Sequence, residues 1–172
     1  MDILYAPWRS TYVKKNKSHT AAQNTENPCP FCVAGMSTDD AKAFVLRKSE
    51  HTLVMLNLYP YNAGHILIVP RAHARTLNDV SSETRREMME LMNSSIELLT
   101  SVLQATGINS GFNLGDAGGA SIPEHLHIHV LPRWLGDTNF LPLLAHTKQI
   151  SIDLIELYQQ LKPHFEQIVL PI

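Results

Sequence analysis

The chain has 172 residues, of which 44% are hydrophobic and 17% charged, and these values predict one soluble globular domain. Its net charge of -2 argues against broad electrostatic binding to nucleic acid, and no apolar run approaches the roughly 20 residues that span a bilayer. The N-terminal stretch has no apolar segment typical of signal peptides, so we expect a cytoplasmic protein without membrane partners.

The first part of the chain is polar. Residues 1–28 contain few apolar side chains after Trp8, and we interpret them as an N-terminal arm and linker, which leaves residues 29–172 as the folded domain. Residues 50–58 and 65–70 are then rich in apolar and β-branched side chains, and a turn-rich segment separates them. This pattern predicts two paired antiparallel strands.

The periodicity then changes from that of strands to that of a helix. Apolar side chains at spacings of three and four predict an amphipathic helix over 81–105, which we expect Gly107 to end. Residues 110–114 predict a third strand, the sequence GDAGGAS at 115–121 a glycine-rich loop, and residues 125–131 a fourth strand.

A second helical pattern closes the chain. Leu154, Leu157, Tyr158 and Leu161 share one helix face, and we expect Pro163 to stop this helix. The order of strand, strand, helix, strand, strand and helix predicts an α+β domain built on an antiparallel sheet.

The stretch EHLHIHVLPRW places histidines at alternate positions of the fourth predicted strand. A strand directs alternate side chains to one face, so His125, His127 and His129 should line one surface. The intervening residues are expected to face the core: Leu126, Ile128 and Val130.

Three interpretations of the histidines are open. They are polar groups on a half-exposed strand, ligands of one metal ion, or catalytic groups. Alternate residues lie about 6.6 Å apart, which is wide for three ligands of one ion. Neutral imidazole is a good nucleophile near neutral pH, and the backbone N–H groups of the loop at 115–121 can cradle phosphate close by. We therefore favour attack on phosphorus.

Several motifs together resemble one family. The run at 125–131 resembles the signature of the histidine-triad (HIT) superfamily of nucleotide hydrolases and transferases. Residues 56–73 are similar to the strand–turn–strand of that superfamily, and 111–121 to its asparagine strand and phosphate loop. The motifs at 4–9 and 132–140 resemble those of the bacterial diadenosine-tetraphosphate phosphorylase-like branch.

The resemblance implies a half-barrel-like α+β domain, with one long helix and a C-terminal helix, that forms a homodimer with a continuous sheet. It implies an enzyme that cleaves a dinucleoside polyphosphate, or a similar nucleotide, through a nucleotidylated histidine. Two acceptors remain as alternatives. Inorganic phosphate would make the enzyme a phosphorylase, and water would make it a hydrolase. Two alternatives are a nucleotide-binding protein without turnover and a metal-dependent nucleotide hydrolase. No organic cofactor is implied.

The resemblance also implies roles for single residues. His127 would be the nucleophile, and His129 would contact phosphate and help the leaving group, while His125 completes the triad. The other residues expected near the substrate are Asn57 at the ribose, Asn113, Gly119 and Ser121 at the phosphates, and His65 close by. The sequence departs from the family pattern at Ala120, where many relatives have glutamine.

Cys29 and Cys32 have the two-residue spacing of a zinc knuckle. Incidental thiols are an alternative, and a redox pair is disfavoured because no parallel βαβ unit surrounds the motif. The resemblance implies that His73 and His125 complete a zinc site, since zinc-bearing relatives use a histidine after the second strand and the first triad histidine. Four protein ligands close a tetrahedral site, so we expect structural zinc.

Overall fold

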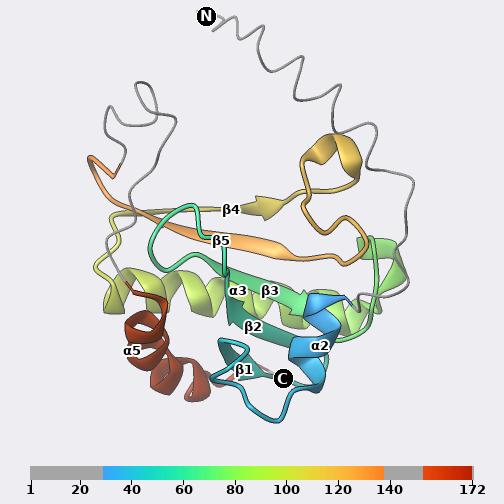
Figure 1. Cartoon of the computed structure of the whole chain (residues 1–172), viewed down its shortest axis with the longest axis horizontal. Coiled ribbons are helices and arrows are strands. Elements are labelled where there is room, and N and C mark those ends of the chain that lie inside the picture. The colour runs from blue at the N-terminus through green and yellow to red at the C-terminus, as the bar shows by residue number, and fades with distance from the viewer. Residues whose placement is uncertain (1–28, 138–152, 172) are drawn as a thin grey trace, which may run out of the picture.

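The computed structural model describes residues 29–137 and 153–171 and consists of an antiparallel sheet with helices on both faces (Figure 1). Its strands are β1 (Val45–Lys48), β2 (Thr52–Leu56), β3 (Ile66–Pro70), β4 (Gly107–Phe112) and β5 (Ile128–Arg133). Its helices are α2 (Pro30–Met36), α3 (Ser82–Val102) and α5 (Leu154–Glu166), with short 3-10 helices η1 (Leu77–Asp79) and η2 (Asp116–Gly118). The predicted α+β class is confirmed. The arm and linker expected over 1–28 lie outside the described residues.

The five strands are ordered β1-β2-β3-β5-β4, and every neighbouring pair is antiparallel. Strand β5 therefore lies between β3 and β4, although it comes last in the sequence. Leu67 of β3 pairs with His129 of β5, and Gly111 of β4 pairs with the same residue from the other side. This register brings the start of β3, and with it His65, beside the histidine run.

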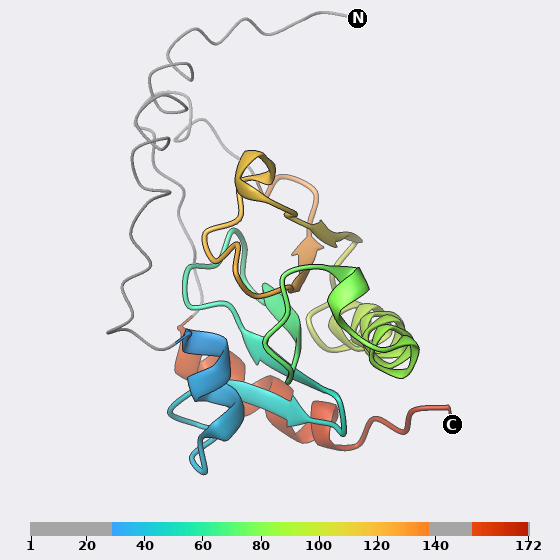
Figure 2. The same cartoon turned by 90° about the vertical axis from the view of Figure 1, so that its right-hand side faces the viewer.

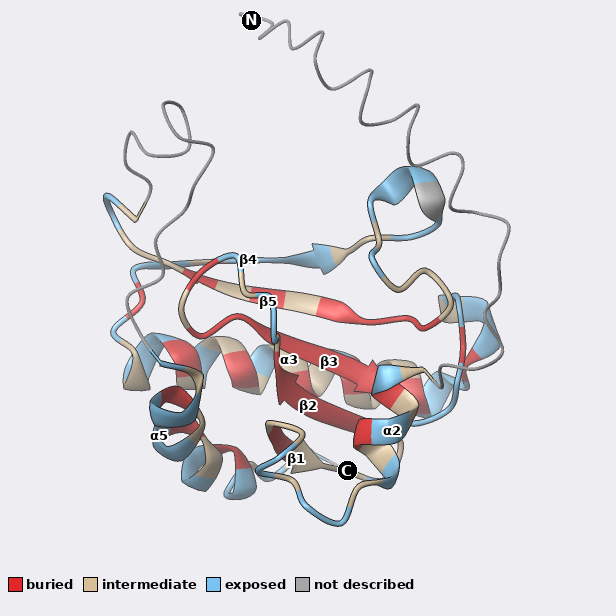
Figure 3. Ribbon diagram, in the orientation of Figure 1, coloured by how far each residue is buried: buried red, intermediate tan, exposed pale blue. Residues whose placement is uncertain are grey.

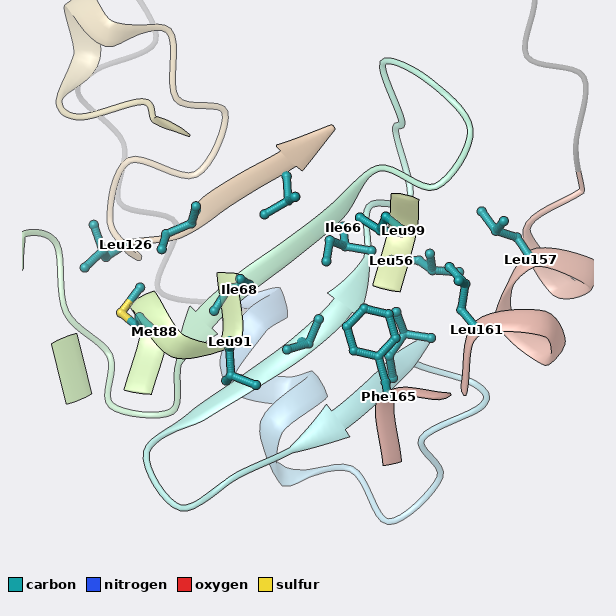
Figure 4. Packing of buried hydrophobic residues seen from close by; sticks show 14 of the residues in the cluster. Leu56, Ile66, Ile68, Met88, Leu91, Leu99, Leu126, Leu157, Leu161 and Phe165 are labelled. Atoms are coloured by element: carbon teal, nitrogen blue, oxygen red, sulfur yellow. The ribbon is translucent and has the colours of Figure 1, made fainter. Parts of the chain in front are cut away.

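One face of the sheet packs on α3 and α5. Figure 4 shows the apolar side chains of this main core converging between the sheet and the two helices, and Figure 3 shows β2 and β3 buried. Leu126, Ile128 and Val130 all belong to this core, which confirms their predicted direction. The alternate side chains of the histidine run therefore face away from it.

The opposite face of the sheet carries α2. Figure 2 shows α2 on one side of the sheet and α3 on the other. Phe31 and Ala34 of α2 pack there with Leu53, Met55 and Leu67 in a second, smaller cluster. Neither α2 nor β1 was predicted from the sequence. The seven residues of α2 are too few to show a helical period, and β1 has only four residues.

The two long helices were predicted, and the residues expected to end them were predicted wrongly. Helix α3 stops at Val102 and Gln104 adopts a φ of 53°, so Gly107 is the first residue of β4 and not the end of the helix. Pro163 lies inside α5 and does not stop it. A proline removes only one backbone donor, and burial of Leu161 and Phe165 on either side holds the helix together.

The strand expected over 125–131 begins later than predicted. Strand β5 starts at Ile128, so His125 and His127 lie in the segment just before it, and only His129 is in the strand. Its side chains still alternate in direction as in a strand, since Leu126 lies in the main core between the two histidines. No helix among the described residues is long and apolar enough to cross a membrane.

Candidate active site and metal centre

A cavity of about 510 Å³ lies between α2 and the second face of the sheet. Its walls are mostly apolar, with Phe31 and Ala34 from the helix and Met55 and Leu67 from the strands. His127 and His129 also line it, so the two histidines border the cavity at the start of β5. An apolar pocket with a few polar groups at one side suits a ligand with a flat apolar part and a polar end.

The proton on His127 can be placed from its hydrogen bond. Its Nδ1 lies 2.8 Å from the backbone oxygen of His125, and a carbonyl only accepts, so Nδ1 carries the proton. The lone pair is therefore on Nε2. Burial lowers the pKa of His127, and its hydrogen bond to the His125 carbonyl partly opposes this shift. His127 is consequently a neutral imidazole at neutral pH, the form that acts as a nucleophile.

A chain of hydrogen bonds fixes the proton on His129 as well. The backbone N–H of Tyr61 donates to Nδ1 of His65 over 3.1 Å, so the proton of His65 is on Nε2. That Nε2 donates to Nδ1 of His129 over 2.9 Å, which leaves the proton of His129 on its own Nε2. This Nε2 is buried, and among the described residues it has no hydrogen-bond partner.

Burial keeps both members of this pair neutral. It is the main cause that lowers the pKa of His65 to about 3, with a further contribution from the charges of His129 and His127. It also lowers the pKa of His129 to about 4, again with a contribution from His127. An unpartnered buried N–H costs about 1–3 kcal/mol, so its presence beside the cavity indicates a place for an acceptor on a ligand.

The loop between β2 and β3 holds the donor to His65 in place. The amide nitrogen of Asn62 donates to the Pro132 carbonyl over 2.9 Å and to Asp137 over 2.7 Å. Gly64 has a φ of 74°, and a Cβ there would lie 2.5 Å from Leu103 Cδ1, so glycine is required. The sequence did not predict the hydrogen bond between Asn62 and Asp137, because only the folded loop brings them together.

Only some of the residues that were expected at the substrate line the cavity. Asn57 and Ser121 line the cavity, and Asn57 Oδ1 accepts the Tyr59 N–H over 2.9 Å. His65 does not line it but lies behind His129, 1% exposed. Asn113 and Gly119 are also outside the cavity lining, in the segment that follows β4.

The expected metal ligands come together. One ligand atom from each of Cys29, Cys32, His73 and His125 lies within 4.8 Å of all the others. The sulfur of Cys29 lies 3.3 Å from Nδ1 of His125, and that of Cys32 lies 3.3 Å from Nδ1 of His73. We call these four residues the Cys–His cluster. It joins α2 to the segment after β3 and to the start of the histidine run.

The geometry of the Cys–His cluster fits zinc. Bonds of about 2.3 Å to sulfur and about 2.0 Å to nitrogen at a tetrahedral angle place the two ligand atoms about 3.6 Å apart. The sulfur of Cys32 lies 3.6 Å from Nδ1 of His125, and the distances from Cys29 to His125 and from Cys32 to His73 are both 3.3 Å. Nε2 of His125 lies 2.9 Å from the Pro70 carbonyl, which places its proton there and leaves Nδ1 for a metal ion.

The family model described as the HIT domain matches residues 38–134, and the chain therefore belongs to the HIT family. This agrees with the family resemblance of the sequence and with the observed α+β fold.

The chain is similar to named relatives and to solved structures of this family. The AP-4-A phosphorylase of Mycobacterium tuberculosis is 33% identical over 86% of this chain and 75% of its own length. The adenylylsulfatase HINT3 of Arabidopsis thaliana is 28% identical over 85% of this chain and 76% of its own. The Zn-bound histidine triad family protein of Mycobacterium smegmatis superposes with a TM-score of 0.65 at 26% identity, covering 81% of this chain and 94% of that one.

Proposed function

We propose that this chain is an enzyme that cleaves the phosphoanhydride of a dinucleoside polyphosphate, or of a similar nucleotide, through a nucleotidylated His127. One observation carries the proposal. The lone pair on Nε2 of His127 and the unpartnered N–H of His129 belong to adjacent rings, with centroids 4.8 Å apart, that both line an apolar cavity. The names of the relatives, AP-4-A phosphorylase and adenylylsulfatase, support a substrate of the nucleotide class.

The first step would form a bond between Nε2 of His127 and the α-phosphorus. The bond from that phosphorus to its bridging oxygen breaks, and the electron pair leaves with the rest of the polyphosphate. The imidazole then carries a positive charge, which the His125 carbonyl stabilises by accepting from Nδ1. The N–H of His129 donates to a phosphate oxygen as charge develops on it.

The second step would transfer the nucleotidyl group to an acceptor. An oxygen of inorganic phosphate or of water attacks the phosphorus, and any proton on that oxygen passes to solvent. The bond to Nε2 breaks and its electron pair returns to the ring, which restores neutral His127. We propose that the base lies in the apolar cavity with Asn57 near the ribose. Ser121, Asn113 and Gly119 would lie near the phosphates, with the backbone of the glycine-rich loop as donors.

Product analysis with diadenosine tetraphosphate tests this function and separates the two acceptors. ATP and ADP formed only when phosphate is present would identify a phosphorylase, and ATP and AMP formed without phosphate would identify a hydrolase. His127→Ala should abolish turnover with either acceptor. A His127→Ala protein that turns over the substrate at the wild-type rate would contradict the proposal.

We propose that the Cys–His cluster binds zinc in a structural role. A bound zinc ion would link α2 to the histidine run and supply no open coordination position, because four protein ligands fill a tetrahedral site. This argues against the alternative of a metal-dependent hydrolase. The other alternative, nucleotide binding without turnover, predicts that His127→Ala and wild type bind nucleotide alike and that neither cleaves it.

We also propose the expected homodimer, in the cytoplasm. Strand β4 is at one edge of the sheet, and its residues are exposed or half-buried. An unpaired edge offers backbone donors and acceptors to a second strand, so two copies can join through β4 into one continuous sheet. Light scattering on a wild-type sample and on an Asn109→Pro variant, which removes a β4 backbone donor, tests this pairing. A wild-type monomer would refute it.

A further inference from the structure

Phe31 lies between the two cysteines of the Cys–His cluster and is 5% exposed. Its ring contacts His125, with centroids 5.4 Å apart, and His127, with centroids 5.1 Å apart. The same side chain lines the cavity. Phe31 therefore touches a candidate metal ligand, the candidate nucleophile and the proposed substrate space at once.

Helix α2, which carries Phe31, has little to hold it by itself. Its seven residues are far fewer than an isolated helix needs, and its N-cap residue, Cys29, makes no side-chain capping hydrogen bond. Two of its side chains, Phe31 and Ala34, are buried. Both cysteines belong to its start, so a metal ion in the Cys–His cluster would fix the first turn against His73 and His125.

We propose that Phe31 is a positioning residue that couples metal binding in the Cys–His cluster to nucleotide binding in the cavity. A metal ion orders α2, and Phe31 then presses on the ring of His127 and completes the cavity wall. This inference rests on the proposed function, because it requires that the cavity takes a nucleotide.

The coupling has a quantitative consequence. If the metal ion tightens nucleotide binding by some factor, then the nucleotide must tighten metal binding by the same factor. Couplings in proteins are typically about 5-fold to 150-fold. We expect a factor of about 10, because a short helix must be ordered and one side chain connects the two sites.

Two dissociation constants test the coupling, with Zn²⁺ and AMP as probes. Calorimetry measures AMP binding to zinc-loaded and to chelator-stripped full-length protein. Competition with a chromophoric chelator measures Zn²⁺ binding with and without saturating AMP. Both constants should change by the same factor of about 10.

Phe31→Leu is the test variant, since it keeps a buried apolar side chain of similar size and leaves all four ligands in place. It should still bind one Zn²⁺ per chain, and AMP should change its zinc affinity less than about twofold. Val33→Ala is the matched control, because Val33 lies on the same helix and lines the cavity but is 46% exposed. It should weaken AMP binding and keep the coupling factor.

The outcomes separate the two proposals. A zinc affinity that AMP does not change in wild type, while AMP still binds, would overturn the coupling and leave the proposed function standing. The same coupling factor in Phe31→Leu as in wild type would overturn the role of Phe31. Absence of AMP binding in the zinc-loaded wild type would overturn both the coupling and the proposed nucleotide site.

Discussion

Replacing His65 with glutamine should flatten the dependence of stability on pH. In the folded chain burial lowers the pKa of His65 to about 3, from an ordinary value of 6.5. Below about pH 6.5 the unfolded chain binds a proton at this histidine and the folded chain does not. The stability that neutral His65 contributes is therefore fully present above 6.5 and is lost as the pH falls toward about 3.

The magnitude follows from the size of this window. At about pH 5, the unfolded histidine has titrated over about 1.5 pH units and the folded one has not, at about 1.4 kcal/mol per unit. His65 alone should therefore remove about 2 kcal/mol from the free energy of unfolding between about pH 7.5 and about pH 5. Glutamine occupies a similar space and can accept from the Tyr61 N–H and donate to His129.

Urea unfolding at both pH values measures the effect. Wild type should lose about 2 kcal/mol more than His65→Gln between the two values, and any loss due to the metal ligands cancels in the comparison. His164→Gln, which changes an exposed histidine of α5, should behave as wild type. An equal loss in wild type and His65→Gln would show that folding does not lower the pKa of His65, and would refute this reasoning.

Three further substitutions test the supports of the site. Gly64→Ala should destabilise the fold by at least about 2 kcal/mol, because a positive φ and the contact with Leu103 both oppose a Cβ, and wild-type thermal stability would contradict this. Cys32→Ser should lower zinc content and melting temperature together, and unchanged zinc content by metal analysis would exclude the cluster. Asp137→Asn, which weakens the 2.6 Å bond to Arg133, should cost about 1–3 kcal/mol in urea unfolding, and a loss below about 0.5 kcal/mol would contradict it.

The elements that were predicted well have a strong local pattern in the sequence, either a long helical repeat or a continuous apolar run. Helix α3 has 21 residues with its buried side chains on one face, and β2 and β3 are buried throughout. Helix α2 escaped prediction for a physical reason. Its two buried side chains, Phe31 and Ala34, pack against strands that follow later in the chain. Such long-range contacts leave no periodic signal in seven residues.

In the candidate site, too, local sequence patterns predicted some features, while others depend on contacts that only the fold creates. The alternation of histidines predicted one shared face, and the motif resemblance brought His73 into the metal proposal, which the closeness of the four ligand atoms supports. The chain of hydrogen bonds from Tyr61 through His65 to His129 could not be predicted, because its first donor is a backbone N–H. Only the folded loop, held by Asn62, aims that donor at the ring.

Proton placement gives the three histidines of the run different chemistry. His125 donates from Nε2 to a carbonyl and keeps a lone pair on Nδ1, toward the cysteines. His127 donates from Nδ1 to a carbonyl and keeps its lone pair on Nε2. His129 accepts at Nδ1 and therefore offers an N–H at Nε2. One residue type at alternate positions can thus supply a candidate metal ligand, a candidate nucleophile and a hydrogen-bond donor, which are the three groups that the proposed reaction and the proposed structural metal require.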